Sequence, residues 1–231
     1  MFFSDTELDT IADHRPSRSP DKSLLKAAVA IIIRDVEWGS EFLLMQRAKH
    51  EHDPWSGQMS FPGGKIEATD ESAKMAAIRE VEEEVGLALT DVDYIGQIDD
   101  VYGLKVDNQY SVHVSCFVFK PTKELSPVGN YEVADLVWLP ISYLDNPNNA
   151  HDHRHPQDLT VKMPSVMIDA DKEQILWGLS LRMLSEFYSL IGRPLRVLSE
   201  QDHSALQKIE QHNVDSSALT GKAKRMFEKR L

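Results

Sequence analysis

The sequence predicts an α/β fold in which a mixed β-sheet lies between helices. Two apolar segments near the N-terminus have the length and composition of buried strands, and a helical segment follows them. Further strand-like segments and a second amphipathic helix come later in the chain. Because strands on both sides of a helix, followed by another helix, form a sheet covered on both faces, we expect an α/β/α sandwich.

The first elements follow from local composition. Residues 27–33 form an uninterrupted apolar run and residues 42–47 form a second one, which indicates two strands with a turn at residues 37–40 between them. Residues 48–62 contain two prolines and a glycine, so we expect a long loop there. Residues 69–86 are expected to be helical.

The second half of the chain continues this alternation. Strands are predicted at residues 94–98, 112–119 and 135–139. Residues 146–155 are expected to form a loop. Apolar residues three and four positions apart predict a helix over residues 169–191, which Gly192 and Pro194 would end.

The chain length favours one domain with two appendages. Its 231 residues exceed the size of one small domain but do not suffice for two full ones. We assign residues 1–24 to a polar lead-in that is loose or partly helical and residues 25–192 to the folded domain. Residues 193–231 are assigned to a polar C-terminal extension.

Composition excludes several classes of protein. Apolar residues make up 42% of the chain and charged residues 27%, which are ordinary values for a globular protein. No apolar run approaches the ~20 residues that span a bilayer, and the N-terminus has no signal peptide pattern. The single cysteine, Cys116, lies in an apolar run, where we expect a buried thiol. These observations favour a cytoplasmic protein.

Charge restricts the partners. The net charge is −12, of which residues 1–192 carry −15 and residues 193–231 carry +3. Such an acidic body disfavours nucleic acid and anionic membranes as partners. If the protein acts on an anionic substrate, its site needs metal cations to offset the repulsion.

Three glutamates share one face of the helix predicted at residues 69–86. With Glu80 at 0° and about 100° per residue, Glu84 falls at about 40° and Glu83 at about −60°. Like charges at this spacing repel each other and weaken a helix unless a cation offsets them. Carboxylate oxygens suit Mg²⁺ or Mn²⁺. An acidic, solvated helix face is the alternative explanation.

Residues 63–87 resemble the Nudix box, whose usual form is G-x5-E-x7-R-E-U-x-E-E-x-G-U with U apolar. Counted from the C-terminal end, the matching residues are Glu71, Arg79, Glu80, Val81, Glu83, Glu84, Gly86 and Leu87. Six residues rather than five separate Gly64 from Glu71. Either Asp70 therefore takes the place of the first glutamate or the loop carries one inserted residue. The resemblance implies the Nudix fold, an α/β/α sandwich, for roughly residues 25–192.

Flanking residues resemble the coenzyme A pyrophosphatase-like branch of that family, in which a similar spacing is found. The matches to its upstream motif are Arg47, Gly57, Gln58, Phe61 and Pro62. Residues 53–56 stand where that motif has a basic residue and a histidine, so the match is incomplete there. Residues 130–133 and 176–179 also resemble parts of this branch.

The resemblance implies an enzyme that hydrolyses a diphosphate linked to another moiety, with Mg²⁺ or Mn²⁺ as cofactor. In such enzymes water attacks phosphorus while the cations neutralise phosphate charge and orient the water. Coenzyme A or a derivative is the first substrate expectation, and ADP-ribose or a nucleotide sugar is the second. A non-catalytic nucleotide-binding regulator is the alternative of another class. The expected partner is a small nucleotide, and a homodimer is left open.

Carried over residue by residue, the resemblance assigns the metal-binding and catalytic roles. Glu80, Glu83 and Glu84 would be metal ligands, with the Gly64 carbonyl as a further one. Arg79 would orient Glu83, and Asp70 or Glu71 would support the site. A box glutamate such as Glu83, or Glu132 from a later loop, would serve as the general base. The alternative for Glu132 is a capping or solvent-facing role.

Four residues are expected to contact the substrate. Arg47 could bind a phosphate bidentately, or simply end a strand. Phe61 could contact the substrate or pack in the core. Gly63 and Gly64 would let the backbone approach a phosphate or metal closely, because no side chain intervenes.

Four aromatic residues in the C-terminal half are weaker candidates for the site. His151, His153 and His155 alternate in the sequence, and a solvated loop explains them better than a metal site, because alternate residues in a loop need not converge. Trp177 is expected to pack in the core rather than stack on a base.

Overall fold

The computed structural model describes residues 1–17, 25–51, 53, 55–103, 105–106, 109–110, 112–155 and 158–204. The helices are α1 (Asp5–Asp13), α2 (Ala73–Val85), α3 (Ile141–Leu144) and α4 (Gly178–Leu190), with a 3₁₀ turn η1 at Pro147–Asn149. The first strands are β1 (Lys26–Val36), β2 (Gly39–Arg47), β3 (Met59–Ser60), β4 (Gly63–Lys65), β5 (Tyr94–Gln97), β6 (Val101–Tyr102), β7 (Lys105–Val106) and β8 (Gln109–Tyr110). The later strands are β9 (His113–Phe119), β10 (Val133–Pro140), β11 (Ala150–His155), β12 (Asp158–Asp169) and β13 (Gln174–Trp177).

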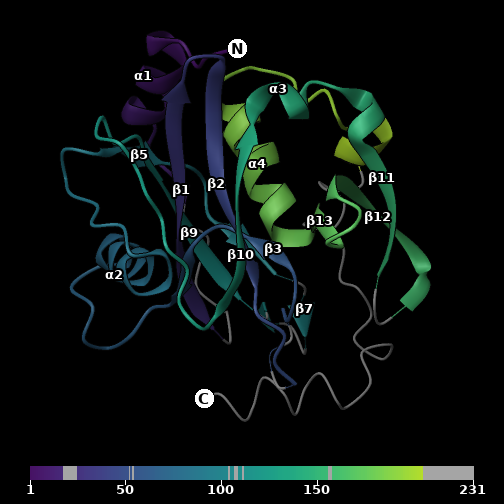
Figure 1. Ribbon diagram of the computed structural model, residues 1–231, viewed down its shortest axis with the longest axis horizontal. Helices are drawn as coiled ribbons and strands as arrows, with labels where there is room; N and C mark the ends of the chain where they lie inside the picture. The colour runs from purple at the N-terminus through teal and green to yellow at the C-terminus, as the bar shows by residue number, and fades with distance from the viewer. Residues whose placement is uncertain are drawn as a thin grey trace.

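A mixed central sheet organises the molecule. Its main path has the strand order β10-β2-β1-β9-β5, and β3, β4 and β6 add short pairings to β2, β1 and β9. Strands β1 and β2 form an antiparallel hairpin, whereas β1 and β9 are parallel. Helix α2 covers one face of this sheet and α4 lies on the other (Figure 1). The predicted α/β/α sandwich with a mixed sheet is confirmed.

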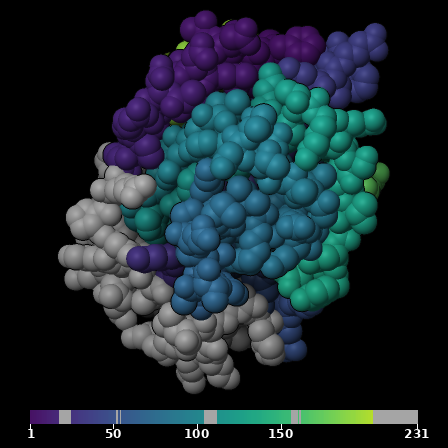
Figure 2. Space-filling model, turned by 90° about the vertical axis from the view of Figure 1, so that its left-hand side faces the viewer, coloured from purple at the N-terminus to yellow at the C-terminus, as the bar shows by residue number. Residues whose placement is uncertain are grey.

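Strand β1 is buried on both faces, which explains its uninterrupted apolar run. Its odd-numbered side chains from Val29 to Ile33 join the core beneath α1 and α4. The even-numbered side chains from Ala28 to Ile32 join the core beneath α2. A strand covered on both faces needs no polar alternation. Figure 2 shows the α2 side of the molecule, with α2 in blue near its centre and α1 in purple along its upper edge.

The N-terminal segment packs into the core. Ser4 and Glu7 form a capping box that begins α1, and Leu8 and Ile11 are buried. A Cβ on Gly96 in β5 would collide with the backbone carbonyl of Ile11, so the close packing of α1 on β5 requires glycine there. Of the two alternatives for the lead-in, loose or partly helical, the structure shows a helix over Asp5–Asp13.

The core also extends beyond α4 and encloses the single thiol. Leu195, Val197 and Leu198 are buried with the α4 side chains. Residues 205–231 of the predicted C-terminal extension lie outside the described residues. Cys116 is buried as expected, and burial raises the pKa of its thiol, which disfavours the reactive thiolate. No helix in the described ranges is long and apolar enough to cross a membrane.

Two predictions about the C-terminal half are wrong. The helix predicted at residues 169–191 begins only at Gly178, because Gln174–Trp177 pair with β12 as strand β13. Ile175, counted in the helical pattern, is a strand residue opposite Met167. The loop predicted at residues 146–155 forms η1 and strand β11.

Strands β11, β12 and β13 form a second sheet, placed on the α4 side of the molecule (Figure 1). The turn between β12 and β13 anchors this sheet to the central one. Lys172 Nζ and Gln174 Nε2 both donate to Asp135 Oδ2 on β10, at 2.7 and 2.8 Å. The second sheet is therefore fixed beside the ends of β2 and β10.

Of the two roles that the sequence leaves open for Phe61, substrate contact or core packing, the structure shows core packing. Phe61 is 1% exposed, and its ring packs edge-to-face on Phe42 with the centroids 6.4 Å apart. The reason is the position of residue 61 between the short strands β3 and β4, where its side chain points into the core beneath α4.

Phe61→Ala should lower the free energy of unfolding by about 3–5 kcal/mol, because it leaves a cavity in a packed core. Urea denaturation monitored by circular dichroism measures this loss. Phe2→Ala is the matched control, since Phe2 is 51% exposed, and its loss should stay below about 1 kcal/mol. Equal losses for the two variants would contradict the core position.

Candidate active site

The site lies along α2, beside strand β4. The Ser72 side chain accepts a hydrogen bond from the Met75 N–H and caps the start of α2, while Gly86, with φ 66°, ends it. The helix predicted from residue 69 therefore begins at Ala73. Residues 67–70 form a turn instead, because Asp70 Oδ2 accepts from the Glu67 N–H at 2.8 Å.

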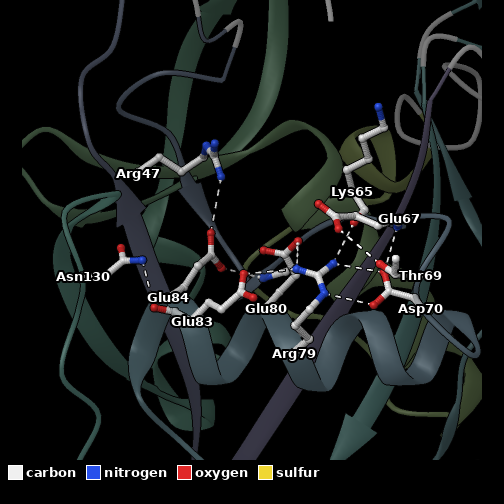
Figure 3. Close-up of polar contacts among 11 residues, drawn as sticks. Arg47, Lys65, Glu67, Thr69, Asp70, Arg79, Glu80, Glu83, Glu84 and Asn130 are labelled. Atoms are coloured by element: carbon white, nitrogen blue, oxygen red, sulfur yellow. Dashed lines mark hydrogen bonds and ion pairs between the residues drawn. The ribbon is translucent and has the colours of Figure 1, made fainter. Parts of the chain in front are cut away.

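The carboxylate of Glu84 is buried beneath the site. Glu84 is 2% exposed. Its Oε2 accepts a hydrogen bond from the Gly63 N–H at 2.8 Å, and its Oε1 lies 3.9 Å from Arg47 Nη1 (Figure 3). Burial raises the pKa of Glu84 to about 8, and the negative charges of Glu80 and Glu132 raise it further. The hydrogen bond from Gly63 and the positive charge of Arg47 lower this pKa but do not offset the burial.

The glycine pair in β4 allows this approach. Gly63 has φ 149°, and a Cβ there would collide with the carbonyl oxygen of Ala28 on β1. A Cβ on Gly64 would lie 2.6 Å from the carboxyl carbon of Glu80. The absence of both side chains thus places two carboxylates of α2 directly against the backbone of β4.

Arg79 connects the carboxylates of Glu80 and Glu83. Its Nη1 donates to Glu80 Oε1 at 2.9 Å and to Glu83 Oε2 at 3.1 Å. Its Nη2 also donates to the carbonyl oxygen of Lys65 at 3.1 Å. Burial raises the pKa of Glu80, against the hydrogen bond from Arg79. Glu83 is the more open ligand candidate, with 55% of its side chain exposed.

The structure distinguishes the two candidates for the first acidic position. Arg79 Nε and Nη2 donate to the two carboxylate oxygens of Asp70, at 2.9 and 3.1 Å. These hydrogen bonds hold the pKa of Asp70 below its usual value. Glu71 is exposed. Asp70 is thus the residue that supports Arg79 at the start of α2.

These carboxylates do not form a preformed metal cage. Glu80 and Glu83 engage Arg79, and Glu84 engages Gly63. Over the ranges that the structure describes, no three His, Cys, Asp or Glu side chains are arranged to hold a metal ion.

Arg47 is held by Asp53, a residue that the sequence analysis did not single out. Arg47 Nε and Nη2 both donate to Asp53 Oδ2, at 2.9 and 2.7 Å, and the Asp53 side chain is 3% exposed. Asp53 Oδ1 accepts from the Trp55 N–H at 3.0 Å. The pairing leaves Nη1 of Arg47 directed towards Glu84. The signal in the sequence was the departure from the upstream motif at residues 53–56.

The loop before β10 brings Glu132 to the site. Burial raises the pKa of both Glu80 and Glu84, and the negative charge of Glu132 adds to this effect. Glu132 N–H donates to Asn130 Oδ1 at 2.8 Å, and the Glu132 carbonyl accepts from the Ala48 N–H at 2.7 Å. Asn130 is a second residue whose role the sequence analysis missed.

His151, His153 and His155 lie on β11, where alternate side chains share one face, so the loop predicted for them is wrong. The rings of His153 and His155 pack on Trp177, with centroids 4.6 and 5.9 Å apart. Trp177 ends β13 and does not lie within the long helix. These residues build the second sheet.

Comparison with known proteins identifies the family. The NUDIX domain family model matches residues 24–158. NudL of Escherichia coli K12, which carries the name of an uncharacterized Nudix hydrolase, is 30% identical over 174 residues, covering 72% of this chain and 83% of NudL. A protein of Schizosaccharomyces pombe, named a probable Nudix hydrolase, is 25% identical over 177 residues, covering 77% of this chain. The chain spans 59% of the length of that relative.

A solved structure supports the fold. The crystal structure of a MutT/Nudix family protein from Enterococcus faecalis has a TM-score of 0.52 and 13% sequence identity, and the match covers 99% of this chain and 93% of that one. The chain belongs to the Nudix family. Both relatives are named as Nudix hydrolases.

In the cation-free protein, the free energy of unfolding of the wild type should fall as pH rises, and Glu84→Gln should abolish this fall. Burial raises the pKa of Glu84 to about 8 in the folded state from an ordinary value of 4.5, so wild-type stability falls as pH rises between these values. In EDTA, calorimetric melting should show the variant gaining on the wild type over this range, by at most roughly 5 kcal/mol. Glu82→Gln, on an exposed position of α2, should track the wild type. Parallel curves for Glu84→Gln and wild type would refute the burial argument.

Proposed function

We propose that the protein hydrolyses the diphosphate linkage of a nucleoside diphosphate joined to another moiety, with Mg²⁺ or Mn²⁺ as its cofactor. The observation that carries this proposal is the buried carboxylate of Glu84, whose pKa is raised by its burial and further by the charges of Glu80 and Glu132. A cluster of this kind is costly to ionise in the absence of a counter-charge. It fits a site that handles a cation and a polyphosphate together.

The residues present fit a divalent cation. The carboxylates of Glu80, Glu83 and Glu84 provide hard oxygen donors on one helix, which suit Mg²⁺ and Mn²⁺. Arg79 also binds Asp70, so its single positive charge is shared among three carboxylates. Gly64 has no side chain to block an ion beside Glu80, and its carbonyl is proposed as a further ligand.

The chain's own groups have distinct roles in this proposal. When bound, the cations neutralise phosphate charge and orient water. Glu80, Glu83 and Glu84 hold the cations, and Arg79 orients Glu80 and Glu83. Water attacks one phosphorus, the bridging P–O bond breaks, and two phosphate monoesters leave. Glu132 is proposed to accept the proton from the water, with Glu83 as the other candidate base.

Coenzyme A or a derivative is the proposed substrate, split into a 3′,5′-ADP part and a phosphopantetheine part. The support is the resemblance of residues 47–62 and 130–133 to the coenzyme A pyrophosphatase-like branch. Arg47 would meet a substrate phosphate through Nη1, because Asp53 occupies its Nε and Nη2. A carboxylate-bound arginine keeps its orientation, which favours one defined phosphate contact.

Hydrolysis of a substrate panel tests the function. Coenzyme A, ADP-ribose and a nucleotide sugar are incubated with Mg²⁺ or Mn²⁺, and the products are separated by anion-exchange chromatography. We expect coenzyme A to be cleaved fastest, EDTA to abolish turnover, and either cation to restore it. Turnover that persists in metal-free buffer would sink the metal role. Preferential cleavage of ADP-ribose would overturn the coenzyme A assignment, and no cleavage at all would favour a non-catalytic regulator.

Glu83→Gln should reduce kcat by more than about 100-fold at saturating Mg²⁺, or about 2.7 kcal/mol of transition-state stabilisation. The change keeps the shape of the side chain but removes a negative charge from the proposed cation site. Glu82→Gln is the matched control, because Glu82 is exposed on the other side of α2, and its kcat should stay within about threefold of wild type. A large loss of kcat in Glu82→Gln, together with a wild-type kcat in Glu83→Gln, would refute the assignment of ligands on α2.

A further inference from the structure

Asn130 connects three parts of the site through one short loop. Its backbone N–H donates to the Glu84 carbonyl at 2.8 Å, and its Nδ2 donates to the Glu83 carbonyl at 2.8 Å (Figure 3). Its Oδ1 accepts from the Glu132 N–H at 2.8 Å. One residue thus binds the backbone of two proposed cation ligands and the backbone of the proposed base.

The end of α2 supplies the anchor for this loop. The last carbonyls of a helix have no partner within the helix. Gly86 N–H satisfies Glu82, and Val128 N–H, two residues before Asn130, satisfies Val85 at 2.9 Å. The two Asn130 contacts satisfy the carbonyls between them. The loop is therefore fixed to the same helical turn that presents Glu83 and Glu84.

The other end of the loop is fixed to the strand that carries Arg47. The Glu132 carbonyl accepts from the Ala48 N–H at 2.7 Å, one residue after Arg47. Glu132 is consequently held between the last turn of α2 and the end of β2. Its backbone groups bind Asn130 and Ala48, and its carboxylate accepts a hydrogen bond from the Tyr131 side chain.

We propose that Asn130 is a positioning residue that sets the place of Glu132 relative to the α2 carboxylates. This inference rests on the proposed function. An amide suits the position, because it offers a donor to the Glu83 carbonyl and an acceptor to the Glu132 N–H in one planar group. Aspartate keeps the acceptor, loses the donor and adds a charge beside the carboxylates. Alanine loses both side-chain bonds.

A double-mutant cycle between Asn130 and Glu132 tests the inference in the full chain. Asn130→Ala should lower kcat by about 10–100-fold with KM within about threefold, because small displacements of a catalytic group cost this much. Asn130→Asp should fall by a similar factor. In the Glu132→Gln background, the same Asn130→Ala change should cost less than about threefold, since the group that it positions is already inactive.

Two controls separate positioning from general stability. Asn146→Ala removes a like contact, in which Asn146 Oδ1 accepts from the Asn148 N–H at 3.0 Å outside the site, and its kcat should stay within about twofold of wild type. Mn²⁺ affinity of Asn130→Ala, measured by titration calorimetry without substrate, should stay within about threefold, because Asn130 binds the backbone carbonyls of Glu83 and Glu84 and not their carboxylates.

Different results would overturn the role of Asn130 and the diphosphatase function. Fully additive losses in an active enzyme, an Asn130→Ala kcat equal to wild type, or a Glu132→Gln variant with normal kcat would each overturn the role of Asn130 and leave the diphosphatase function intact. A tenfold loss of Mn²⁺ affinity in Asn130→Ala would replace positioning of Glu132 by support of the cation ligands. A wild type without hydrolysis of any panel compound would overturn both proposals.

Discussion

The burial of the Glu84 carboxylate against the backbone of β4 is the constraint on which the rest of the site depends. A buried carboxylate needs a hydrogen-bond donor, and the Gly63 N–H provides it only because β4 lies tightly against β1. That tight contact tolerates no side chain at Gly63. The hydrogen bond between Glu84 and Gly63 therefore fixes the distance of α2 from the central sheet. The carboxylates of Glu80 and Glu83 on the same helix are positioned as a result.

Two arginines divide the work of balancing this negative charge. Arg79 binds the carboxylates along the open side of α2, and Asp70 fixes its guanidinium from the start of the helix. Arg47 approaches Glu84 from the end of β2, and Asp53 fixes it from the following loop. Each arginine thus has its own carboxylate partner outside the helical face. This arrangement keeps both guanidinium groups in place, and the charge of the α2 carboxylates is only partly neutralised.

The central fold and the acidic helix face could be predicted from the sequence because both depend on short-range periodicity. The structure confirms the strand predicted from the apolar run in β1 and the helix predicted for the glutamates of α2. The Arg47–Asp53 ion pair and the hydrogen bonds of Asn130 could not be predicted. Each depends on how a loop packs against an element that is distant in the sequence. The choice between Asp70 and Glu71 likewise depended on where the turn before Ser72 aims its side chains. The second sheet was missed because Ile175 continues the helical spacing of α4 by coincidence, and the polar alternation of β11 lacks the apolar signal of a buried strand.

The parallel pairing of β1 with β9 has a consequence for the order in which the chain folds. The β1–β2 hairpin closes over a few residues, whereas β1 and β9 are separated by most of the sequence that forms the site. During synthesis, β2, β4 and α2 are therefore made while one long apolar edge of β1 still has no neighbour. That interval is when chaperone capture and aggregation compete with folding. The acidic site is assembled on a sheet that is still incomplete, and the arrival of β9 completes the sheet.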